Sequence, residues 1–146
     1  MGYLAQDTLL EVYPLAIPKV KAQILEILTQ GKNPKCRAYL ADALSAKNNL
    51  LRSKALDAVD FFKFKDLWLE VVDCLPDSNW SIRAKALDVL AGLGVREARP
   101  YVELLLGDQD EWVRQCAANC LKALDALDID YNCREEGNGD NVTGME

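Results

Sequence analysis

Two stretches of the chain, LRSKALDAV at residues 51–59 and IRAKALDVL at residues 82–90, are near copies that begin 31 residues apart. When residues 51–81 are aligned with residues 82–112 without a gap, eight positions are identical, whereas average composition would give about two. A fixed period of this length is typical of stacked structural repeats. We therefore expect a repeat architecture and not a single central core.

The 31-residue register extends over most of the chain. One column holds Lys21, Arg52, Arg83 and Arg114, and the column before it holds Val20, Leu51, Ile82 and Val113. Within each period apolar residues recur at helical spacing, and breakers such as Pro14 and Pro76 leave two segments of about three turns. We predict first helices near residues 3–13, 34–45, 65–75 and 96–106, and second helices near residues 18–30, 49–62, 80–92 and 111–125.

These helix pairs predict how the whole domain is organised. One pair of short helices cannot bury its apolar face alone, so successive pairs must stack. We predict an all-α fold, an α-α superhelix of about four antiparallel helix pairs, as one domain over residues 1–127. The repeats are expected at residues 1–31, 32–62, 63–93 and 94–125. Residues 128–146 are polar, acidic and rich in Gly and Asn, which predicts a disordered acidic tail.

Composition excludes several classes of function. The 146 residues include 17 Lys plus Arg, 23 Asp plus Glu and no histidine, for a net charge of −6. The missing histidine removes imidazole bases and the commonest metal ligand, so we expect neither an enzyme nor a bound cofactor or metal. The five cysteines are not spaced as a disulfide framework, which favours the reducing cytoplasm. No apolar run is long enough to span a membrane.

A recurring turn motif identifies a family resemblance. It reads Asp77-Ser-Asn-Trp80-Ser-Ile82-Arg83 in one copy and has Asp108, Trp112, Val113 and Arg114 in the next. The motif resembles the HEAT repeat family, most closely the short-period HEAT-like repeats of phycobilisome lyase proteins. The resemblance implies a right-handed solenoid whose Arg-bearing second helices line a concave surface. The first pair departs from it, because Leu15 and Lys21 replace the Asp and Arg, which predicts a cap or a divergent repeat.

The Asp and Arg columns are the most regular charges in the chain. An Asp in the turn and an Arg six residues later can bond to turn amides and to each other across adjacent repeats. We therefore predict that these residues form a structural ladder that fixes how repeats stack, and not a binding site. The ladder comprises Arg52, Asp77, Arg83, Asp108 and Arg114.

Exposed second-helix columns that vary between repeats are the better candidates for binding. One column holds Gln23, Lys54, Lys85 and Cys116, and three residues later come Glu26, Asp57, Asp88 and Asn119. A solvated face with pairs at i,i+3 is the alternative interpretation. Exposed tryptophans are favoured interface anchors. Trp112 departs from its otherwise polar or aliphatic column and is one candidate. Trp68 aligns with arginines, so we expect it to be exposed on the convex side as a second candidate. The predicted partner-binding residues are Gln23, Glu26, Lys54, Asp57, Lys85, Asp88, Trp112 and Asn119.

Cysteines and phenylalanines have simpler interpretations. Cys116 and Cys120 lie four residues apart, with Cys133 downstream, but a zinc site would lack a fourth ligand. Cys120 shares a column with Val89 and is expected to be buried, whereas Cys116 is better placed as an accessible thiol. Phe62 and Phe64 are expected in the core.

The predicted function is that of a non-catalytic adaptor or scaffold that binds another protein on the concave face. An enzyme subunit similar to the phycobilin lyases, handling a tetrapyrrole or its carrier protein, is the first alternative. Nucleic-acid binding is the second, and it is disfavoured because the second helices have no basic stripe. No membrane association is expected.

Overall fold

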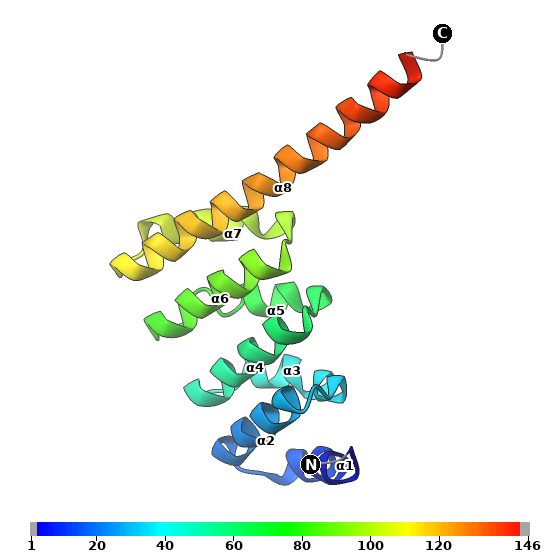
Figure 1. Cartoon of the computed structure of the whole chain (residues 1–146). Coiled ribbons are helices and arrows are strands. Elements are labelled where there is room, and N and C mark those ends of the chain that lie inside the picture. Colours follow the sequence, from blue (N-terminus) through cyan, green and yellow to red (C-terminus); the bar gives the residue numbers. More distant parts are fainter. Residues whose placement is uncertain (1–2, 144–146) are drawn as a thin grey trace.

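The computed structural model describes the backbone of residues 3–143 and the side chains of residues 5–127. Within residues 3–143 the chain forms helices and no strand (Figure 1). The α-helices are α1 (Tyr3–Val12), α2 (Pro18–Gln30), α3 (Arg37–Leu44), α4 (Asn49–Phe62), α5 (Trp68–Val72), α6 (Trp80–Leu93), α7 (Arg99–Glu103) and α8 (Glu111–Thr143). The short 3-10 helices are η1 (Tyr13–Leu15), η2 (Pro34–Cys36), η3 (Lys65–Leu67), η4 (Arg96–Ala98) and η5 (Leu104–Gly107).

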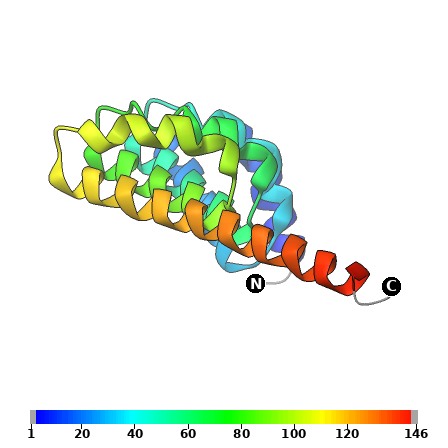
Figure 2. The same cartoon turned by 90° about the horizontal axis from the view of Figure 1, so that it is seen from above.

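The helices form two layers. The second helices α2, α4, α6 and α8 lie side by side in one layer, and α1, α3, α5 and α7 form the other (Figures 1 and 2). Each first helix and the second helix that follows it make one pair, so four pairs are stacked in chain order. The predicted all-α solenoid is therefore confirmed, and the second-helix bounds agree with the predicted ones up to the end of α6.

Three of the second helices end in the same way. Lys32, Lys63 and Gly94 have left-handed backbone conformations, with φ of 55°, 55° and 67°, and they occupy one column of the 31-residue register. After the first two, the following amide closes the turn: the Asn33 N–H donates to the Leu28 carbonyl at 2.9 Å, and the Phe64 N–H donates to the Val59 carbonyl at 3.1 Å. A left-handed residue with this bond is a common C-terminal helix stop. The chain can then reverse into the next first helix.

The fourth second helix does not stop at this column. Asp125 takes the place of Gly94, and α8 continues through it to Thr143. Its C-terminal half projects beyond the stack (Figure 1). Residues 128–143 of the predicted disordered tail are thus helical in the described backbone, where neither a proline nor a left-handed residue ends the helix. Residues 144–146 lie outside the described residues. The side chains after Leu127 lie outside the described residues.

Each first helix is shorter than predicted. Pro34, Lys65 and Arg96 share a column, and each opens a 3-10 turn before the α-helical part begins. In the second repeat the Asn33 side chain accepts a hydrogen bond from the Lys35 N–H at 3.1 Å and so caps this turn. The helical period that predicts these segments does not distinguish a 3-10 turn from the first turn of an α-helix.

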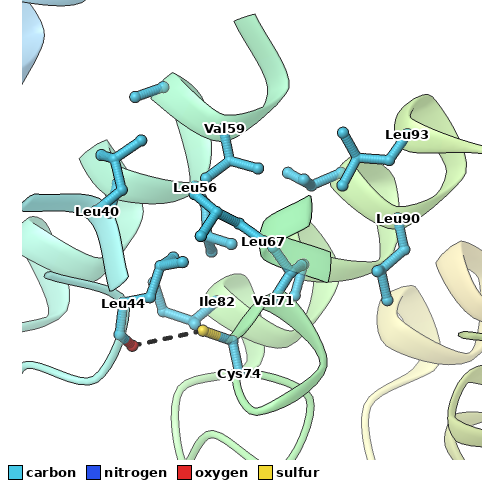
Figure 3. Close-up of a cluster of buried hydrophobic side chains, with 14 of the residues drawn as sticks. Leu40, Leu44, Leu56, Val59, Leu67, Val71, Cys74, Ile82, Leu90 and Leu93 are labelled. Carbon is cyan, nitrogen blue, oxygen red and sulfur yellow. Dashed lines mark hydrogen bonds between the residues drawn. The ribbon is translucent and has the colours of Figure 1, made fainter. Parts of the chain in front are cut away.

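The core is a continuous strip between the two layers. Leu25, Leu56 and Leu87 occupy one column and are each fully buried. Figure 3 shows a part of this strip, in which Leu56 and Val59 of α4 approach Val71 of α5. Burying one such side chain contributes about 1.5–3 kcal/mol, so each repeat boundary has its own share of apolar stabilisation.

Three predicted aromatic positions lie at the margin of the core. Phe62 and Phe64 are half-buried, pack against the core, and stack with their ring centroids 5.2 Å apart. Trp68 also packs against the core and is half-buried, so the expectation that it is exposed on the convex side is wrong. Its ring lies 6.4 Å from that of Tyr101, which fixes it between α5 and α7.

Candidate functional site

The first ladder rung joins the second repeat to the third. Arg52 faces Asp77, with the Nε–Oδ2 distance at 2.7 Å and the Nη2–Oδ1 distance at 3.1 Å. Arg52 Nη1 also donates to the Ala46 carbonyl at 2.6 Å, and Asp77 accepts from the Asn79 N–H at 2.8 Å. Only the Nη2 contact is a hydrogen bond, because the buried Nε has the short ion-pair distance without hydrogen-bond geometry. A guanidinium–carboxylate pair of this kind is strong and directional. This contact therefore sets the position of one repeat on the next.

The second rung repeats this geometry between the third and fourth repeats. Arg83 Nε and Nη2 each lie 2.9 Å from an oxygen of Asp108, and Nη1 donates to the Asp77 carbonyl at 2.8 Å. The hydrogen bond from Arg83 lowers the pKa of Asp108. The side chains of Arg83 and Asp108 are only 15% and 8% exposed, so a partner has little access to them.

The ladder residue nearest the C-terminus has no acceptor for its fork. Arg114 Nη1 donates to the carbonyls of Asp108 and Gln109, at 2.7 and 3.2 Å. Among the described residues no carboxylate pairs with its Nε or Nη2. The structure thus brings four of the predicted ladder residues into two rungs and leaves Arg114 bonded only to its own turn.

The first repeat boundary uses aromatic contacts instead of a rung. Lys21 lies over the Tyr13 ring, 5.2 Å from its centroid, and Tyr13 stacks on Tyr39 at 4.3 Å. The Tyr39 hydroxyl donates to the Leu10 carbonyl at 2.8 Å. The 31-residue register does not predict this cluster. Its signal is a tyrosine at position 13, where the register has Leu44 and Leu75.

Predicted partner-binding charges form a second row of contacts between repeats. Lys54 Nζ lies 3.2 Å from Glu26 Oε1, and Lys85 Nζ lies 2.9 Å from Asp57 Oδ1. Each pair connects neighbouring second helices and not two turns of one helix, which differs from the i,i+3 interpretation. The face is thus polar and largely neutralised over α2, α4 and α6.

In α8 the column that holds Lys54 and Lys85 has no lysine. Cys116 replaces it and is only 4% exposed, so the expectation of an accessible thiol is wrong. Burial, and then the Asp88 and Asp110 carboxylates, raise the pKa of Cys116. Asp88 is exposed, and no cation among the described residues pairs with it. Cys120 is buried as predicted, its pKa raised by burial to about 11, and the Cys133 side chain lies outside the described residues.

The remaining predicted polar residues lie toward the two ends of this face. Gln23 of α2 and Asn119 of α8 are both exposed. Asn119 accepts a hydrogen bond from Gln115 Nε2 at 3.1 Å. Among the described side chains no group of three metal-binding residues comes together. The face therefore offers contacts to a polar surface and, in the described part, no cluster for metal chemistry.

One large apolar side chain is exposed at the start of each second helix. We call this set the apolar edge: it comprises Ile17, Leu50, Trp80 and Trp112, which are 64%, 44%, 50% and 60% exposed. The N-terminal ends of α2, α4, α6 and α8 follow one side of the stack (Figure 1). Of the four, sequence analysis singled out only Trp112 as a binding residue. An apolar residue at the N-cap or in the first turn of every second helix is the signal for the others.

Comparison with known proteins supports the HEAT repeat family. The family model of HEAT repeats matches residues 69–130, which span α6, α7 and the N-terminal part of α8 together with both rungs' aspartates. No curated protein matches the chain. No helix within the described residues is long and apolar enough to cross a membrane.

Proposed function

We propose that this protein is a non-catalytic adaptor or scaffold that binds another polypeptide across its second-helix face. The apolar edge is the observation that carries this proposal. Each second helix has a large exposed apolar side chain at its N-cap or in its first turn, and the N-terminal ends of these helices follow one side of the stack (Figure 1). Tryptophan side chains are over-represented among the residues that dominate binding energy. A partner segment that follows the stack would contact one of them at every repeat.

The charged row beside the edge favours a protein partner over a nucleic acid. Lys54 and Lys85 are paired with carboxylates of the preceding repeat, and Arg52 and Arg83 are held in the ladder. Binding to a phosphate backbone draws on several unpaired cations. The paired lysines instead offer alternating donors and acceptors, which suit the polar groups of a polypeptide.

The buried thiols support a non-catalytic role in a reducing cytoplasm. Burial raises the pKa of Cys74 and Cys120 to about 11, so both are protonated and poor nucleophiles near neutral pH. The likeness to phycobilisome-lyase repeats rests on the turn motif at Asp77 to Arg83 and Asp108 to Arg114. It makes a tetrapyrrole the ligand to test as the alternative, by absorbance on mixing.

Comparative capture followed by titration tests the proposal. The intact protein and a Trp80→Ala/Trp112→Ala variant are used as bait, and the captured protein is then purified and titrated by calorimetry. We expect the double variant to lose at least about tenfold in affinity. Leu104→Ala is the matched control, because Leu104 is 78% exposed in η5 and lies outside the apolar edge. Equal affinity for the intact protein and the double variant would contradict the proposal.

A further inference from the structure

The two rungs of the ladder are a template for what the free end of the stack is built to accept. Arg83 anchors Nη1 on the carbonyls of Asp77 and Ser78, at 2.8 and 3.3 Å, and directs Nε and Nη2 to the aspartate of the next repeat. Arg114 anchors Nη1 in the same way on its own turn, at 2.7 and 3.2 Å. Its fork is therefore positioned before any acceptor arrives.

The apolar residues around Arg114 follow the same template. In α6, Leu87 and Leu90 are fully buried where the next repeat covers them. Their counterparts in α8 are Ala118 and Leu121, which are only half-buried. No element among the described residues lies on the side of α8 opposite α6 (Figure 1). The outer face of α8 thus has the arginine and a small apolar patch of a stacking surface, without the repeat that would cover it.

The chain does not complete this surface itself within the described residues. A fifth pair would require α8 to end near Asp125, but the helix continues through this residue to Thr143. A second copy stacked end to end would not complete it either. The residue it would bring to the rung is Leu15, which is 88% exposed and has no carboxylate.

We propose that the outer face of α8 is a docking surface for a partner protein that presents an aspartate-bearing helical turn. The partner's carboxylate accepts two hydrogen bonds from Arg114, and its helix packs on Ala118 and Leu121. We expect the partner's group to be a carboxylate because it complements the positive charge of Arg114. In both existing rungs the arginine at this register position pairs with an aspartate. This surface is separate from the apolar edge and does not depend on it.

A peptide with the known rung sequence serves as the probe. A fluorescein-labelled peptide of residues 94–125, which contains the Asp108 turn and whose helical content is first established by circular dichroism, is titrated against the full chain and followed by anisotropy under reducing conditions. We expect saturable binding that weakens about tenfold with Arg114→Gln in the protein or Asp108→Asn in the peptide. Together the two changes should cost no more than either alone, since they remove one interaction.

Matched variants decide between this contact and general charge attraction. Lys122→Gln removes the same charge from an exposed site on α8 and should change the affinity less than about twofold. Arg114→Lys keeps the charge but loses the fork and should bind weakly, as Arg114→Gln does. The proposal is overturned if the peptide shows no binding up to 1 mM. It is also overturned if Lys122→Gln and Arg114→Gln weaken binding equally, or if the losses from Arg114→Gln in the protein and Asp108→Asn in the peptide are additive.

Discussion

The boundary between the first two repeats and the boundary between the last two are built with different chemistry. Arg83 and Asp108 join the last two repeats through a forked ion pair that also bonds to a turn. At the equivalent place in the first boundary, Lys21 covers the ring of Tyr13 and Tyr39 stacks beneath it. The difference teaches that the 31-residue period fixes where repeats meet, while the polar contact at each meeting point can be exchanged for an aromatic one.

The largest expected effect comes from breaking the second rung. Arg83→Ala removes a fork that is mostly buried and leaves the carboxylate of Asp108 without its cation. We expect a loss of about 3 kcal/mol of unfolding free energy, because unpairing a buried carboxylate is costly, and a melting temperature lower by several degrees. Thermal denaturation followed by circular dichroism measures it. Arg114→Ala is the control and should cost under about 1 kcal/mol; equal losses would show that the rung does not stabilise the stack.

A smaller effect is expected at the aromatic boundary. Tyr13→Leu installs the residue that the register has at Leu44 and Leu75, and it removes both the stacking on Tyr39 and the cation–π contact of Lys21. We expect a loss of about 1–2 kcal/mol, measured by urea denaturation. A variant as stable as the natural chain would mean that leucine packing alone suffices there and that the aromatic cluster adds nothing.

Acid should separate the two boundaries further. The pKa of Asp108 is lowered from 3.8 by the Arg83 hydrogen bond, so the rung's contribution is complete above this pH and is lost as the pH falls below it. The Tyr13 boundary has no carboxylate in its rung position and should not share this loss. Urea denaturation at pH 7 and at pH 3 should show a smaller difference for Asp108→Asn than for the natural chain. If the unfolding free energy changed equally between pH 7 and pH 3 in both proteins, the rung would not be the cause of the acid sensitivity.

The smallest effect is on the rates of thiol alkylation. Cys36 and Cys74 are both buried, and burial raises the pKa of each to about 11. Their reaction therefore depends on local opening. Cys36 lies at the start of the second repeat, beside the boundary without a rung, and should react before Cys74. Timed alkylation with peptide mass analysis measures both rates. Faster reaction of Cys74 would reverse the proposed order of boundary stability.

Much of the stack was predictable because the repeat is a property of spacing. The 31-residue register predicts α2, α4 and α6 within one residue, since the apolar period and the breakers between helices recur together. It also predicts which Asp and Arg residues belong to the ladder, while the structure decides that Arg52 pairs with Asp77 and Arg83 with Asp108. The partners of Lys54 and Lys85 were not predictable, because a charge on a helix surface can pair within its helix or with the next one, and only the separation of the helices decides.

Three local environments also depended on the packing. Cys116 shares a column with Lys54 and Lys85, which suggests an exposed side chain, yet only 4% of it is exposed. Trp68 occupies an arginine column and is half-buried against the core. Ile17, Leu50 and Trp80 look like ordinary apolar residues in the sequence, and only the structure shows that their side chains are 64%, 44% and 50% exposed.

The sequence by itself determined the class of fold, the number of repeats and the chemistry of the ladder, because these follow from periodic spacing along one chain. The tertiary structure decided which surfaces are left open within the described residues: the apolar edge, the carboxylate of Asp88 and the fork of Arg114. Exposure depends on what lies across a repeat boundary, and the residues that meet there, such as Arg83 and Asp108, are 25 positions apart in the chain. A side chain's own column therefore cannot show whether it is covered.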